Sequence, residues 1–158
     1  MANLKKDLRE FIALLNSHKV EYLIVGGHAV AFHGHPRFTG DIDFFIRPTI
    51  ENAGRVIAVL REFGFGNLAL VPGDLIAPGR VVQLGRPPGR IDLLTSISGV
   101  EFEEAWGLRV LAKLHGKAVN FLGWDALIRN KEASGRDKDR SDLKKLQAIA
   151  ARKRSRKL

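Results

Sequence analysis

The 158-residue sequence predicts a single α/β (α+β) domain with a helical C-terminal part. Three observations predict this class: short apolar runs alternate with segments of helical periodicity, turn-forming residues join two pairs of apolar runs, and the last two segments are both helical. A chain of this length can bury one core, and no repeat or linker divides it. We place the domain at residues 1–151 and expect the basic tail, residues 152–158, to be disordered.

The predicted helices are identified by apolar residues that recur about every 3.6 positions. In the first helix Leu8, Phe11 and Leu15 follow this spacing, and charged residues lie mostly off their stripe. The second helix is short, because Gly34 and Pro36 end it. The expected helices span residues 4–17, 28–33, 50–63, 100–106, 124–133 and 137–151.

The predicted strands are short apolar runs bounded by turn-forming residues. The first run is apolar almost throughout, as in a sheet that is buried on both faces. The segment Gly-Arg-Pro-Pro-Gly at residues 85–89 and the pair His115 and Gly116 each separate two such runs, which indicates two β-hairpins. The expected strands span residues 21–25, 41–46, 68–71, 80–84, 90–94, 108–114 and 117–121.

Composition excludes several classes of protein. The hydrophobic share of 45% and charged share of 27% are typical of a globular domain. No apolar run approaches the ~18 residues of a membrane span, and the charged N-terminus does not resemble a signal peptide. The absence of cysteine excludes disulfides and thiolate metal sites, so we expect a cytoplasmic protein with no membrane partner. Five of the positive charges behind the net charge of +9 lie in the tail, where such a block binds polyanions only loosely.

Three aspartates occupy strand positions, where acidic residues are unfavourable. Asp41 and Asp43 are two residues apart in one predicted strand, so both side chains project from the same face, and Asp92 interrupts another apolar run. Neighbouring carboxylates repel one another and resist burial unless a cation lies between them. A divalent metal is the expected cation. The alternative is that Asp41 caps a turn while Asp43 pairs with Arg37 or Arg47.

A pair of glycines, Gly26 and Gly27, separates the first predicted strand from the second predicted helix. Glycine allows the backbone to approach a ligand closely, and the N-terminus of a helix presents free N–H groups to an anion such as phosphate. A glycine pair at such a corner also occurs for steric reasons alone. The turn therefore indicates a phosphate site only in combination with the aspartates.

The combined pattern resembles the nucleotidyltransferase superfamily of DNA polymerase beta. Gly26 and Gly27 are followed after thirteen residues by the Asp41-Ile42-Asp43 triplet and later by Asp92, as in that family. Segments 37–40, 130–133, 135–139 and 142–143 look like those of the small bacterial and archaeal members, which include minimal nucleotidyltransferases and relatives of abortive-infection toxins. The resemblance covers residues 21–147 and implies a mixed β-sheet flanked by helices.

The resemblance also implies roles for individual residues. Asp41, Asp43 and Asp92 would hold two Mg²⁺ (or Mn²⁺) ions, and Asp92 would accept the proton of the attacking hydroxyl. The glycine turn and nearby hydroxyl and cationic side chains would bind the nucleotide. These nucleotide-binding residues are Gly26, Gly27, Arg37, Thr39, Lys131 and Lys138. For residues 131–142 the alternative is a solvated helix surface on which Lys138 pairs with Asp142.

The implied activity is transfer of a nucleoside monophosphate from an ATP-like nucleoside triphosphate (NTP) to a hydroxyl. The acceptor would be an RNA or tRNA end, a protein side chain or a small molecule. Many small relatives pair with a helical partner protein in toxin–antitoxin systems, and a minimal domain is also suited to form a homodimer. Because Gly27 stands where many members have serine, two alternatives stay open: a catalytically weak nucleotide-binding or regulatory module, and an RNA-associated basic protein.

Overall fold

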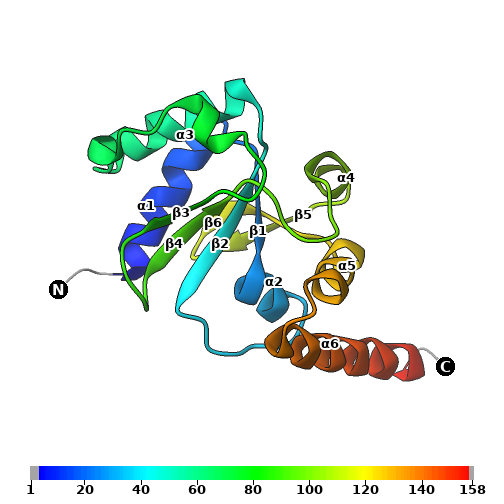
Figure 1. The fold of residues 1–158 in the computed structure, drawn as a ribbon. Coiled ribbons are helices and arrows are strands. Elements are labelled where there is room, and N and C mark those ends of the chain that lie inside the picture. Colours follow the sequence, from blue (N-terminus) through cyan, green and yellow to red (C-terminus); the bar gives the residue numbers. More distant parts are fainter. Residues whose placement is uncertain (1–3, 157–158) are drawn as a thin grey trace.

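The computed structural model describes residues 4–156, which form a six-stranded mixed sheet with helices around it (Figure 1). The strand order is β3-β4-β2-β1-β6-β5. The β2–β4 and β1–β6 pairs are parallel, and the other three pairs are antiparallel. The strands are β1 (Tyr22–Val25), β2 (Asp41–Ile46), β3 (Val81–Leu84), β4 (Arg90–Leu94), β5 (Val110–Leu114) and β6 (Lys117–Phe121).

The helices form two groups around the sheet. In Figure 1, α1 and α3 lie together on one side, while α2, α5 and α6 gather on the other. Helix α2 packs against β1 and β2, and α5 packs against α6. The helices are α1 (Leu4–Ser17), α2 (Gly26–Phe32), α3 (Ile50–Glu62), α4 (Phe102–Gly107), α5 (Trp124–Ser134) and α6 (Asp137–Arg156). None of those between residues 4 and 156 is long and apolar enough to cross a membrane.

The central strands are held by aromatic packing. All four side chains of β1 are buried. The ring of Phe44 in β2 contacts Phe11 of α1 and Tyr22 of β1, with centroids 5.6 and 5.5 Å apart. Because side chains alternate along a strand, burying Ile42 and Phe44 on one face of β2 turns its two aspartates to the opposite face.

The predicted mixed α/β fold is confirmed. Strands 41–46, 90–94 and 117–121 and helix 4–17 have the predicted bounds, and both hairpins form. The predicted strand at residues 68–71 is wrong. Its first residue ends a 3₁₀ helix, Gly66–Leu68, and Ala69 has a left-handed backbone with φ of 54°, which an extended strand cannot accommodate. A second 3₁₀ helix, Pro72–Leu75, then buries Leu75 beside α3.

The last helix is longer than expected. We predicted its end at residue 151, followed by a disordered tail, whereas α6 continues to Arg156. Lysine and arginine are good helix formers, and cations near a helix C-terminus interact favourably with its dipole. Residues 152–156 are therefore helical, and residues 157–158 of the predicted tail lie outside the described part of the chain.

Candidate active site

The parallel pair β2–β4 brings the three predicted aspartates together. Asp43 lies opposite Asp92 in the register of this pair, and Asp41 lies opposite Arg90. One carboxylate oxygen from each of Asp41, Asp43 and Asp92 lies within 4.8 Å of the others. The acidic cluster, as we call these three side chains, is a set of oxygen ligands of the kind that Mg²⁺ prefers.

A guanidinium that the sequence reasoning missed bridges the acidic cluster. Nε of Arg90 donates to Asp92 at 2.8 Å, and one terminal nitrogen donates to Asp92 at 3.0 Å and to Asp41 at 2.9 Å. Arg90 stands two residues before Asp92, so the alternation of side chains along a strand would have predicted that both share a face.

The predicted alternative, in which Asp43 pairs with Arg37 or Arg47, is wrong. Arg37 pairs instead with Asp142, and Arg47 pairs with Glu21 and Glu103.

The acidic cluster is only partly neutralised. Burial raises the pKa of Asp43 to about 7, and the charges of Asp41 and Asp92 add to this shift. Burial also raises the pKa of Asp92 despite the opposing effect of Arg90. Burial would raise the pKa of Asp41 as well, but hydrogen bonds from Thr39, Asp92 and Arg90 outweigh it and lower that pKa. The guanidinium of Arg90 thus pairs with Asp41 and Asp92 but not with Asp43, and a further cation would be favourable here.

The glycine turn fits closely around the acidic cluster. Gly26 has φ of +65°, and a Cβ there would lie 2.1 Å from a carboxylate oxygen of Asp43. A Cβ on Gly27 would lie 2.9 Å from Cβ of Thr39 and 3.0 Å from its hydroxyl oxygen. That hydroxyl donates to the backbone carbonyl and the carboxylate of Asp41, each at 3.0 Å. Thr39 thus places a hydroxyl beside Gly27.

Two of the predicted nucleotide-binding cations belong to a second charged group, the buried network. Lys131 is 3% exposed, and its ammonium lies 3.1 Å from both Asp139 and Asp142. Arg37 binds Asp142 through two nitrogens at 2.8 and 2.9 Å, and Arg136 binds Asp139 at 2.7 Å.

The predicted alternative of a solvated helix surface at residues 131–142 is wrong for these carboxylates. Asp142 is only 2% exposed and pairs with Lys131 and Arg37. Lys138, the other cation predicted to bind nucleotide, is exposed on α6. It lines neither of the pockets that flank the acidic cluster.

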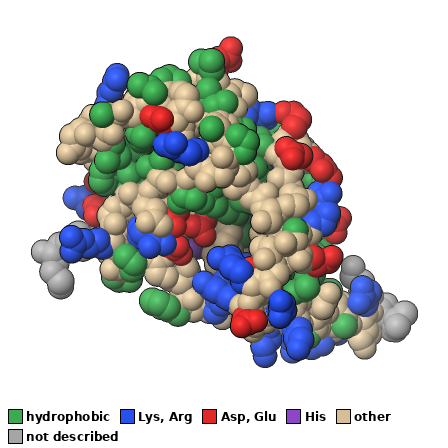
Figure 2. All heavy atoms as spheres, in the orientation of Figure 1, with side chains coloured by type: hydrophobic (Ala, Val, Ile, Leu, Met, Phe, Trp, Pro, Cys, Tyr) green, Lys and Arg blue, Asp and Glu red, His purple; other side chains and the backbone are tan. Residues whose placement is uncertain are grey.

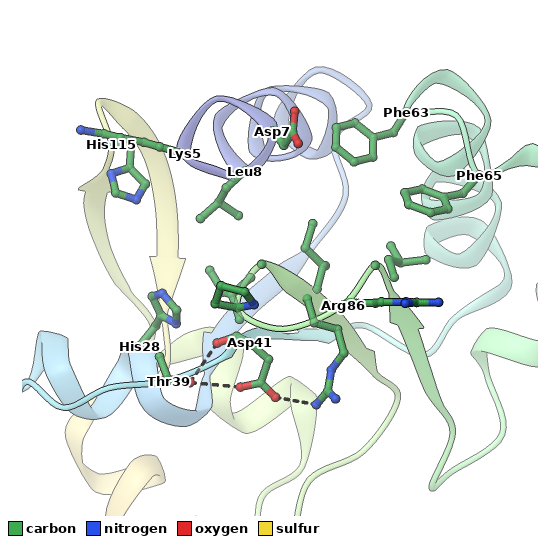
Figure 3. A pocket seen from close by; sticks show the side chains of 17 residues that line it. Lys5, Asp7, Leu8, His28, Thr39, Asp41, Phe63, Phe65, Arg86 and His115 are labelled. Carbon is green, nitrogen blue, oxygen red and sulfur yellow. Dashed lines mark hydrogen bonds and ion pairs between the residues drawn. The ribbon is translucent and has the colours of Figure 1, made fainter. Parts of the chain in front are cut away.

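Two pockets flank the acidic cluster. The glycine-turn pocket, about 300 Å³, lies beside Asp43 and is lined by Gly26, Lys131 and Arg136 together with Ser96 and Ser98. The hairpin pocket, about 410 Å³, lies beside Asp41, between α1, the end of α3 and the β3–β4 hairpin (Figure 3). In Figure 2 acidic side chains lie at the edge of a central hollow, with hydrophobic side chains above it and Lys and Arg below.

Comparison with known proteins identifies the fold. No family model and no curated protein matches the sequence. The crystal structure of ANT(2'')-Ia in complex with adenylyl-2''-tobramycin is similar, with a TM-score of 0.54 and 17% identity over 99% of this chain and 100% of that chain. The solution structure of the antibiotic-resistance factor ANT(2'')-Ia is also similar, with a TM-score of 0.55 and 18% identity over 96% of this chain and 91% of that chain. The chain therefore has a nucleotidyltransferase-like fold, while the toxin-like subtype stays a prediction.

Proposed function

We propose that the chain is a metal-dependent nucleotidyltransferase that moves a nucleoside monophosphate from an NTP to a hydroxyl acceptor. The observation that carries the proposal is the acidic cluster, whose three carboxylates lie within 4.8 Å of one another between two pockets. Strand carboxylates this close serve no packing purpose, since each resists burial. The ANT(2'')-Ia structures, one of which holds an adenylyl-2''-tobramycin complex, support this reaction class by their fold.

The acidic cluster fits a divalent cation. Its donors are all oxygens, and the pKa of Asp43, raised by burial and by its acidic neighbours, indicates uncompensated negative charge. Asp41, Asp43 and Asp92 would hold Mg²⁺. When bound, the metal would stabilise the negative charge that develops on the attacking and leaving oxygens.

The chain's own residues would position the two substrates. In the reaction the acceptor oxygen bonds to the α-phosphorus, pyrophosphate leaves, and Asp92 takes the acceptor proton. Gly26 lets the phosphates approach Asp43 without a side chain between them. Lys131 uses two of its three donors on Asp139 and Asp142, so the third can reach a phosphate in the glycine-turn pocket. The side chain of Arg136, 74% exposed, adds a cation there.

A catalytically weak nucleotide-binding module is the second candidate, and Arg90 is the observation that favours it. Its guanidinium occupies carboxylate oxygens of Asp41 and Asp92 that a metal would use. If Arg90 stays in place, the chain would bind Mg²⁺-NTP and become more stable without turnover, because a ligand bound only to the native state raises the melting temperature.

Transfer of radiolabel from α-labelled NTPs in the presence of Mg²⁺ tests the first candidate. We expect pyrophosphate release and label transfer to a hydroxyl acceptor in a cell extract. Asp43→Asn should lower the rate by roughly 100-fold or more, because a metal ligand contributes several kcal/mol to the transition state. Asp125→Asn, on the exposed start of α5, is the matched control and should be unchanged. Label transfer that persists in Asp43→Asn would reject the assignment.

A further inference from the structure

We infer that the hairpin pocket binds the acceptor, and that this acceptor carries a planar apolar ring and a negative charge beside its hydroxyl. The inference rests on the proposed function, because the acidic cluster separates this pocket from the glycine-turn pocket that would hold the phosphates. Asp41 lines the hairpin pocket and Asp43 lines the glycine-turn pocket. An acceptor hydroxyl in the hairpin pocket and a phosphate in the glycine-turn pocket would therefore meet at the acidic cluster.

The wall of the hairpin pocket suits a flat ring. Phe63 and Phe65 stand side by side at the end of α3, with centroids 5.8 Å apart and planes inclined by 30°. Both rings are only partly buried, and Figure 3 shows them directed toward the space above Asp41. The rest of the apolar lining is formed by Leu8, Ile42, Leu84, Pro88 and Ile91. Aromatic side chains bind flat rings by stacking, largely regardless of which ring it is.

The charge around the hairpin pocket does not suit a polycation. Arg90 pairs with Asp41 at 2.9 Å, and in the proposed reaction Mg²⁺ would take up the remaining negative charge of the acidic cluster. The charged side chains that remain in the lining are Lys5 and Arg86 against a single carboxylate, Asp7. Lys5 and Arg86 are both exposed at the rim, where they would attract an anionic group. An aminoglycoside such as tobramycin, with several ammonium groups, would instead need an excess of carboxylates.

One buried polar atom beside the hairpin pocket lacks a hydrogen-bond partner in the described part of the chain. Nδ1 of His28 is buried and contacts no hydrogen-bond partner among residues 4–156. Figure 3 places this ring beside Thr39 and near Asp41. Because protein atoms enclose this nitrogen, an acceptor hydroxyl would bond it only after the ring turned toward the pocket, and that hydroxyl would then lie close to the acidic cluster.

Two sources offer this chemistry: the terminal nucleotide of a single-stranded RNA, and a free aromatic hydroxy acid. Titration calorimetry on the full chain distinguishes them with a five-nucleotide RNA bearing a 3′-hydroxyl, 4-hydroxyphenylacetate and tobramycin as probes. We expect at least one anionic probe to bind at least about tenfold more tightly than tobramycin. Phe65→Ala should weaken that probe by about tenfold, the cost of one lost stacking contact. Arg86→Gln should weaken it about threefold or more, and Arg152→Gln, on the exposed end of α6, should leave it unchanged.

Binding of ATP with Mg²⁺, measured on the same variants, separates the two pockets. Arg136→Gln should weaken ATP binding, whereas Phe65→Ala and Arg86→Gln should not. ATP binding that depends on Phe65 would overturn the inference, because the pocket would then hold the nucleobase. Tight binding of tobramycin, or no binding of either anionic probe, would also overturn it. Label transfer to tobramycin would reject the inferred acceptor but keep the proposed function. Binding of an anionic probe without label transfer from any NTP would keep the inferred ligand of the hairpin pocket but reject the proposed function.

Discussion

The acidic cluster and the buried network are both built from enclosed aspartates, yet their electrostatics are opposite. In the cluster one guanidinium, that of Arg90, pairs with two of the three carboxylates, and burial raises the pKa of Asp43 and of Asp92. In the network burial acts in the same direction on Asp139 and Asp142. Their hydrogen bonds and ion pairs with surrounding cations outweigh it, and both pKa values are lowered.

The difference shows which group is complete without a ligand. Desolvation opposes a charged carboxylate in either place, so the number of cations per carboxylate decides the outcome. The network has Lys131, Arg37 and Arg136 for two carboxylates and joins α5, α6 and the segment before β2. We therefore interpret the network as stable without a ligand, although Lys131 and Arg136 also line the glycine-turn pocket, and the acidic cluster as a site that takes up a cation.

The largest expected effect is the loss of the ammonium from the network. Lys131→Met should lower the free energy of unfolding by about 3–5 kcal/mol, because it leaves buried carboxylates short of a partner. Urea denaturation at pH 7.5 measures this change. Lys144→Met, on the exposed face of α6, is the control and should stay within about 0.5 kcal/mol of the parent chain. A loss below about 1 kcal/mol for Lys131→Met would mean that the network is not structural.

The acidic cluster should respond to neutralisation in the opposite direction. Without metal, Asp43→Asn should raise the free energy of unfolding at pH 8 by roughly 1–3 kcal/mol. Folded Asp43 has a pKa of about 7 against the usual 3.8, so the folded chain binds this proton more tightly than the unfolded chain. Its contribution to stability is full below about pH 4 and is lost as the pH rises toward 7.

Urea denaturation of the parent chain and of the Asp43→Asn variant, in EDTA from pH 4 to 8, checks this prediction. The stability difference between Asp43→Asn and the parent should be near zero at pH 4 and greatest at pH 8. Adding Mg²⁺ at pH 8 should stabilise the parent more than the variant, since the cation binds the native carboxylates. A parent that is the more stable of the two at pH 8 in EDTA would show that the cluster is already balanced without metal.

The same comparison explains what could be predicted from the sequence. Strand alternation relates Asp41 to Asp43 by position alone, and the same rule would have placed Arg90 beside Asp92. That Asp92 joins the other two aspartates was expected only from the family resemblance, because the pairing of β2 with β4 brings them together. The network was not predictable, since Lys131 meets Asp139 and Asp142 only through the angle between two helices. Arg37 lies 105 positions from its partner Asp142. Such pairs depend on tertiary packing, which no local spacing encodes.

The smallest expected effect concerns Arg37, which the sequence assigned to nucleotide binding and the structure places in the network. Arg37→Lys keeps the charge but loses the two-nitrogen bond to Asp142, which should cost about 1 kcal/mol of unfolding free energy. Affinity for Mg²⁺-ATP should change less than about twofold, because Arg37 lines neither of the two pockets that flank the acidic cluster. Arg61→Lys, exposed at the end of α3, is the control. A severalfold loss of affinity for ATP with unchanged stability would contradict this assignment. Arg37 would then act in nucleotide binding together with the acidic cluster, and its ion pair with Asp142 would not be structural.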